Sequence, residues 1–82
     1  MPKVVLQAKI ANQFTAGTTQ LDIEAKNIRQ LIEALDQRYP GMGTHLSTNT
    51  AVAIDGEIFQ EPYLESIGTD SEIHLLPMIG GG

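Results

Sequence analysis

The residues best suited to chemistry stand at the carboxyl end of the chain, where Gly80, Gly81 and Gly82 follow one another. Glycine loses more conformational freedom on ordering than any other residue, so fixing four tail residues costs on the order of 4 to 8 kcal/mol. That cost is understandable if a partner has a narrow channel that admits only bare backbone. We therefore expect the terminal carboxylate of Gly82 to be the reactive group, and Gly80 and Gly81 to be recognised by the channel.

The side chains offer no second candidate for catalysis. The chain contains no cysteine, which excludes a disulfide framework, a thiolate metal site and a cysteine nucleophile. Its two histidines, His45 and His74, do not stand at a spacing typical of a triad or a metal site, and strand alternation predicts that His74 points to solvent. We expect no metal site and no cofactor bound by this chain.

Charge is unevenly distributed along the 82 residues. All five basic residues stand in the first half, whereas residues 40–82 carry six acidic residues and no basic one. The acidic second half repels the phosphate backbones of nucleic acids and anionic lipids, so neither nucleic acid nor a membrane is an expected partner. It suits a basic protein partner, or simply serves solubility. Without a membrane-spanning run or a secretory signal pattern, the chain is expected to be a cytoplasmic, single-domain protein.

The first half of the chain predicts two strands and a helix. Apolar and polar residues alternate over residues 4–10 and again over residues 19–23, which indicates a hairpin with a fairly long loop. A stripe of apolar residues at helical spacing then predicts an amphipathic helix from Ile28, with Asn27 as its N-cap. The helix should end near Arg38, before a Tyr-Pro-Gly turn.

The second half predicts a loop and three more strands. After a polar loop over residues 44–50, Asp55-Gly56 stands between the apolar runs 51–54 and 57–59, which is a strong hairpin signal. A packed connection, formed by Pro62, Tyr63, Leu64 and Ile67, leads to the last strand, residues 72–76. The expected fold is α+β, with a mixed sheet of about five strands covered by one main helix. We divide it into a domain, residues 1–78, and a glycine-rich tail, residues 79–82.

Three stretches together resemble the ThiS/MoaD family of ubiquitin-like sulfur carriers. They are Val-Ala-Ile-Asp-Gly-Glu at 52–57, Asp-Ser-Glu-Ile at 70–73 and Leu-Pro-Met-Ile-Gly-Gly-Gly at 76–82, and the helix ending in Tyr-Pro-Gly fits the same pattern. The resemblance implies the β-grasp fold and a last glycine that a ThiF/MoeB-like enzyme adenylates. The glycine is then converted to a thiocarboxylate, which donates sulfur to a synthase. ATP and magnesium are implied for the activating partner, not for this chain.

The departures from the family pattern concern the pathway and the terminus. The ending differs from the Pro-Pro-Val-Ala-Gly-Gly of molybdopterin synthase small subunits, so thiamin, molybdopterin and cysteine synthesis all stay open. The chain would be a carrier and not an enzyme, or the small subunit of a molybdopterin-synthase-like complex. A third glycine also shifts the carboxylate outward, which leaves open whether Gly81 or Gly82 reacts.

Apolar residues near the tail are candidates for docking a partner. Leu76 is expected to point outward on the last strand near Met78, with Phe59 on the neighbouring hairpin. The alternative is that Phe59 and Met78 complete the core. Two other functions also stay open, a protein modifier that joins its last glycine to lysines and a binding module whose glycines are only a flexible end.

Overall fold

The computed structural model describes the backbone of residues 1–47, 50–59 and 64–77. Its elements in chain order are β1 (Lys3–Leu6), α1 (Ala8–Phe14), β2 (Gln20–Asp22), α2 (Ile28–Arg38), α3 (Met42–Ser47), β3 (Thr50–Ile54), β4 (Glu57–Phe59) and β5 (Glu72–Pro77). The strands form one sheet in the order β2-β1-β5-β3-β4. Strand β5 pairs in parallel with β1 and antiparallel with β3, which confirms the predicted mixed sheet and α+β class.

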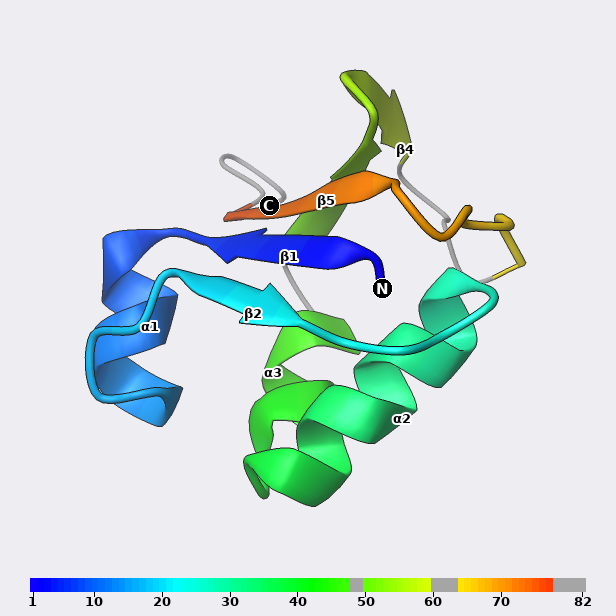
Figure 1. Ribbon diagram of the computed structural model, residues 1–82. Helices are drawn as coiled ribbons and strands as arrows, with labels where there is room; N and C mark the ends of the chain where they lie inside the picture. The colour runs from blue at the N-terminus through cyan, green and yellow to red at the C-terminus, as the bar shows by residue number, and fades with distance from the viewer. Residues whose placement is uncertain (48–49, 60–63, 78–82) are drawn as a thin grey trace.

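All three helices lie on the same side of the sheet (Figure 1). The buried faces of β1 and β5 contribute Val4, Ile73 and Leu75, and α2 contributes Leu31 and Leu35, all with exposures of 0%. The predicted helix stripe therefore faces the sheet as expected. Helix α2 also begins as predicted, because Asn27 Oδ1 accepts a hydrogen bond from the backbone N–H of Gln30 at 2.8 Å.

The strand predicted over residues 4–10 is wrong beyond Leu6. The chain turns into α1, in which Ile10 and Ala11 are buried and Ala8 is exposed. Ile10 fits either a strand alternation with Leu6 or a helix, and the tertiary contacts of the core select the helix. Strands β1 and β2 still pair antiparallel as expected, so α1 occupies the long loop of the predicted hairpin. Thr15 closes α1, since its Oγ1 donates to the carbonyl of Ala11 at 3.0 Å.

The polar loop predicted over residues 44–50 is also wrong in part, because α3 continues to Ser47. Met42 and Leu46, four residues apart, place apolar side chains in the core. The start of α3 is held by Asp36 of α2, whose Oδ1 accepts hydrogen bonds from the N–H groups of Gly41 at 3.2 Å and Gly43 at 2.9 Å. A Cβ on Gly43 would lie 2.8 Å from the Asp36 Cβ, so this close approach requires glycine.

The hairpin predicted at Asp55-Gly56 is confirmed. Both residues have positive φ, +50° and +89°, as a two-residue type I′ turn requires, and Ile54 pairs with Glu57 across it. The connection to β5 agrees only in part with its prediction. Ile67 is buried, whereas Leu64 is 84% exposed, and Pro62 and Tyr63 lie outside the described residues.

Replacing Leu35 by alanine should lower the free energy of unfolding by about 2 to 5 kcal/mol, because the side chain is fully buried between α2 and the sheet. Chemical denaturation followed by circular dichroism measures the change. A loss below about 0.5 kcal/mol would contradict this packing, since surface substitutions reach that size.

Candidate functional site

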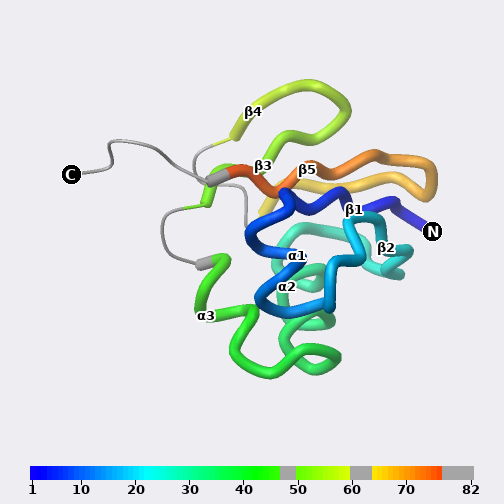
Figure 2. Tube along the Cα trace, turned by 90° about the vertical axis from the view of Figure 1, so that its left-hand side faces the viewer, coloured from blue at the N-terminus to red at the C-terminus, as the bar shows by residue number. Residues whose placement is uncertain are grey.

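The structure fixes the end of the strand that precedes the glycine tail. Met78, Gly80, Gly81 and Gly82 lie outside the described residues. Strand β5 ends at Pro77, in the middle of the sheet, with β1 and β3 on its two sides. Because β1 runs parallel to β5 and starts opposite Glu72, the amino terminus and the end of β5 lie at opposite ends of the sheet (Figure 2).

The other side of the sheet is not covered by any described helix (Figure 1). We call this side the open face. Strand register places one cross-strand row on it, which consists of Gln20, Val5, His74, Ala53 and Ile58. A second, shorter row is formed by Leu76 and Ala51, which pair with each other closer to the tail.

Most side chains of these two rows are apolar. Ile58 is 62% exposed, Val5, Ala51 and Leu76 are half-buried, and Ala53 is buried although no described helix lies over it. Such a cluster beside the start of the tail is the kind of surface that a protein partner covers. Leu76 was singled out from the sequence, but Ile58 was not. The signal was present, because a two-residue turn at Asp55-Gly56 brings Ile58 opposite Ala53.

Phe59 lies on the helix side of the sheet and not on the open face. It pairs with Val52, whose side chain is buried with Leu75, and it packs against the core while staying half-buried. The position agrees with the alternative in which Phe59 completes the core. Met78, the third predicted docking residue, is among the residues that the structure does not describe.

The two histidines lie in different layers of the molecule. His74 is on the open face, its side chain 39% exposed, and its Nε2 lies 2.6 Å from Glu72 Oε1. His45 in α3 contacts the ring of Phe14 in α1, with centroids 5.5 Å apart. The histidines therefore do not form one site. Within the described residues, no group of three or more histidine or carboxylate side chains could hold a metal ion.

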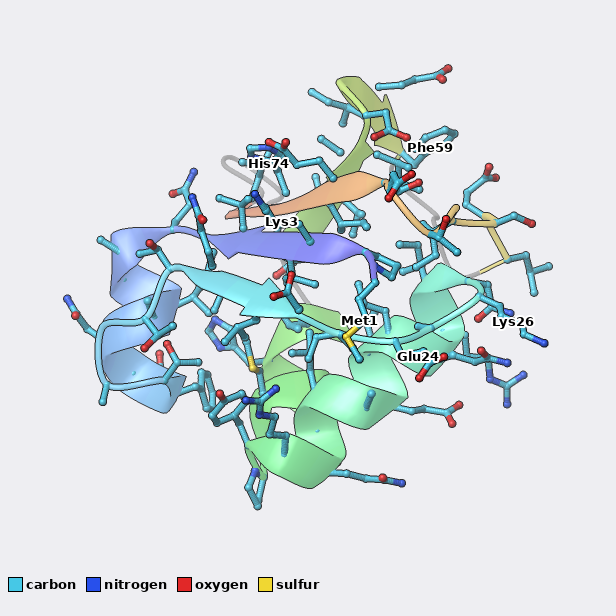
Figure 3. All side chains as sticks on the ribbon, in the orientation of Figure 1. Met1, Lys3, Glu24, Lys26, Phe59 and His74 are labelled. Atoms are coloured by element: carbon cyan, nitrogen blue, oxygen red, sulfur yellow. The ribbon has the colours of Figure 1, made fainter. Side chains whose placement is uncertain are left out.

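A hollow of about 460 Å³ lies beside the amino terminus. It is lined by Met1, Pro2, Glu24, Ala25, Lys26, Gln30, Ile67 and Thr69, and Figure 3 shows Met1, Glu24 and Lys26 near the start of α2. Because β5 ends at the opposite end of the sheet, the hollow does not belong to the site of the tail. In the part of the chain that the structure describes, no helix is long and apolar enough to span a membrane.

A model of the ThiS family matches residues 4–82, which is nearly the whole chain including the three glycines. The chain belongs to the ThiS family. The resemblance seen in the three sequence stretches is confirmed, and with it the assignment to the small ubiquitin-like sulfur carriers. No curated protein sequence matches this ThiS-family chain.

Solved structures with the same fold include three of similar size. CysO from Mycobacterium tuberculosis has a TM-score of 0.84 at 14% identity and covers 96% of this chain and 100% of its own. A chain of the BexX/CysO complex from Amycolatopsis orientalis has a TM-score of 0.85 at 16% identity, with full coverage of both chains. SAMP1, the small archaeal modifier protein 1 of Methanosarcina acetivorans, has a TM-score of 0.81 at 21% identity and covers 99% of this chain and 95% of its own. These likenesses confirm the β-grasp fold.

Truncation of the two neighbouring residues Phe59 and Ile58 of β4 should change the free energy of unfolding to different extents. Phe59→Ala should lower the free energy of unfolding by about 1 to 3 kcal/mol because the ring packs against the core. Ile58→Ala should change it by less than about 0.5 kcal/mol, since the side chain is largely in solvent. Denaturant melts of both variants provide the comparison, and equal losses would show that the faces of β4 are assigned wrongly.

Proposed function

We propose that this ThiS-family chain carries sulfur on its terminal glycine, which a ThiF/MoeB-like enzyme adenylates and which is then converted to a thiocarboxylate. One observation carries the proposal. The three glycines follow, after only Met78 and Ile79, a strand that is paired on both sides in the middle of the sheet. A rigid base and a tail without side chains suit insertion of the carboxylate into a channel of another protein.

The chemistry requires activation because a carboxylate is a poor electrophile. A carboxylate oxygen of Gly82 attacks the α-phosphorus of ATP and releases pyrophosphate, which leaves an acyl adenylate. Sulfide then attacks the carbonyl carbon, AMP departs, and a carbon–sulfur bond replaces the carbon–oxygen bond. If the donor is a persulfide, the first product is an acyl disulfide, and a thiol of the sulfur donor must then attack its S–S bond, forming a new disulfide and releasing the thiocarboxylate. The partner provides the phosphate and magnesium site, and this chain provides recognition and reach.

The tail is long enough for its carboxylate to react inside a partner while the domain stays outside. Five residues follow Pro77, and a fully extended chain spans up to about 3.4 Å per residue, so the carboxylate can lie about 17 Å beyond the sheet. The domain therefore stays outside the catalytic channel while its last atoms react inside. The open face, with Ile58 and Leu76, would rest on the partner beside the channel entrance.

The acceptor of the sulfur would be a synthase of cofactor or cysteine biosynthesis in the cytoplasm. The likeness to CysO of Amycolatopsis orientalis, which was solved in a complex with BexX, supports a carrier that docks on a second protein. Thiamin, molybdopterin and cysteine pathways differ in the acceptor and not in the activation step. A role as small subunit of a molybdopterin-synthase-like complex uses the same thiocarboxylate.

A second candidate function is protein modification through the same activated glycine. The name of SAMP1, a small archaeal modifier protein, favours this alternative. A lysine amine would then replace sulfide as the nucleophile at the acyl adenylate. Mass spectrometry separates the two functions, because a thiocarboxylate exchanges one oxygen for sulfur whereas conjugation gives larger species on a denaturing gel. A binding module whose glycine tail does not react would give neither a thiocarboxylate nor a conjugate.

Substitution at the end of the tail should slow activation without changing the fold. Gly82→Ala adds a methyl group beside the carboxylate, and a displacement of about 1 Å can cost on the order of a hundredfold in a positioned reaction. The measurement is ATP–pyrophosphate exchange with the adenylating enzyme of the same organism. Equal exchange by wild type and Gly82→Ala would contradict the channel, and activity confined to a variant lacking only Gly82 would identify Gly81 as the reactive residue.

An acidic residue in the apolar rows should weaken binding of the activating enzyme. Ile58→Asp is expected to raise the KM for the carrier by about tenfold with kcat within twofold, since burying an unpaired carboxylate in the complex is costly. The matched control is Leu64→Asp, which introduces the same charge at another exposed apolar residue, 84% accessible to solvent. Leu64 precedes Glu65, whose carbonyl accepts a hydrogen bond from the backbone N–H of Ile28 at the start of α2. If both variants behave alike, Ile58 is not part of the interface.

A further inference from the structure

Most of the basic residues lie outside the sheet. Of the five basic residues only Lys3 lies in a strand; the others are Lys9 in α1, Lys26 before α2, and Arg29 and Arg38 within α2. Figure 3 shows Lys3 and His74 on neighbouring strands above the sheet, and Lys26 near the start of α2. The open face is therefore short of positive charge.

Acidic residues gather at one end of this face. In the strand register, Asp22 of β2 and Glu72 of β5 stand opposite Lys3 of β1, so the three side chains form one cross-strand row. Asp55 continues the row beyond β5. Its Oδ1 accepts a hydrogen bond from the backbone N–H of Glu72 at 2.9 Å, and its own N–H donates to the Glu72 carbonyl. We call Asp22, Glu72 and Asp55 the acidic row.

The acidic row is not neutralised within the described part of the chain. The ion pairs found there join Arg29 with Glu33 and His74 with Glu72, and no lysine or arginine lies within 4.0 Å of the carboxylates of Asp22 or Asp55. Three carboxylates against the ammonium group of Lys3 give the cross-strand row itself a charge of −2 when His74 is neutral. The charge is exposed to a partner and is screened by water and by salt.

The open face therefore changes from acidic at the start of β5 to apolar near the end of β5. Glu72 stands at its start and Leu76 near its end, about 13 Å apart at the usual rise of a strand. The acidic end lies far from the tail and the apolar end lies next to it. A surface with such a gradient can be matched in only one orientation by a partner with a complementary gradient.

We propose that the acidic row orients this carrier on its activating enzyme by facing a basic patch of that enzyme. The proposal rests on the proposed function and adds the chemistry of the partner surface. In this orientation the apolar rows cover the channel entrance and the tail points into it, whereas the reversed orientation would turn the tail outward. With the tail extended, the basic patch lies roughly 30 Å from the reacting carboxylate.

Charge reversal at matched positions tests the orientation. Asp22→Lys and Glu33→Lys make the same change in net charge at exposed positions, one in the acidic row and one on α2. Asp55→Asn removes a charge while its amide oxygen keeps the hydrogen bond to Glu72. Lys3→Glu extends the acidic row and should lower the KM, a change that loss of folding cannot produce. ATP–pyrophosphate exchange with the adenylating enzyme of the same organism gives the KM for each carrier between 0.05 and about 0.5 M salt.

Asp22→Lys and Asp55→Asn should raise the KM about 3- to 10-fold at low salt with kcat within twofold, and Lys3→Glu should lower it. These differences should shrink as salt is added, and Glu33→Lys should behave as wild type. Equal effects of Asp22→Lys and Glu33→Lys, or a raised KM for Lys3→Glu, would overturn the orientation while the proposed function stands. Absence of exchange with the wild-type carrier would instead overturn the proposed function, and this inference with it.

Discussion

Strand β5 is hydrogen-bonded on both sides, in parallel to β1 and antiparallel to β3, and the point from which the glycine tail leaves the domain depends on this double pairing. Its inward side chains, Ile73 and Leu75, are fully buried beneath the helices. A strand at the edge of the sheet would have one row of unpaired backbone groups and could fray. Because both flanks and one face of β5 are held, the chain leaves the domain from a fixed point.

The described helices all lie on one side of the sheet, so the apolar core and the open face lie on opposite sides of it. Helices α1, α2 and α3 bury the apolar residues of one face of the sheet, which gives a small domain its core. No described helix covers the other face, which carries Ile58 and His74 in the middle of their strands and Leu76 near the end of β5. Phe59 shows how sharp the division is, since it follows Ile58 directly and belongs to the core side.

The two properties of the open face would contribute to binding in different ways. Charges such as Asp22 and Asp55 act over a distance comparable to the Debye length, about 8 Å at physiological salt, and so influence encounter and orientation. Apolar contacts at Ile58 and Leu76 act only once the surfaces touch, and so govern how long the complex lasts. A carrier that must be activated, released and passed to an acceptor benefits from fast association without very tight binding.

The sequence by itself determined the elements whose signals are local. Helix α2 follows from its apolar stripe and from Asn27, and the β3–β4 hairpin follows from Asp55-Gly56, whereas the reactive end inferred from the run of glycines stays a prediction. These signals are strong because the backbone conformation they favour depends on the residues themselves. The family assignment rests on the same stretches, and the absence of cysteine follows directly from the composition.

Elements that depend on contacts with distant residues could not be predicted from local patterns. Residues 8–10 fit a strand or a helix, and burial of Ile10 and Ala11 against the core selected the helix α1. Helix α3 is too short to be stable alone, and it depends on the cap from Asp36 and on the burial of Met42. The parallel pairing of β1 with β5 joins the two ends of the chain, and no local pattern encodes it. It is this pairing that creates the open face and its acidic row, because side chains far apart in sequence share a face only after the strands are in register.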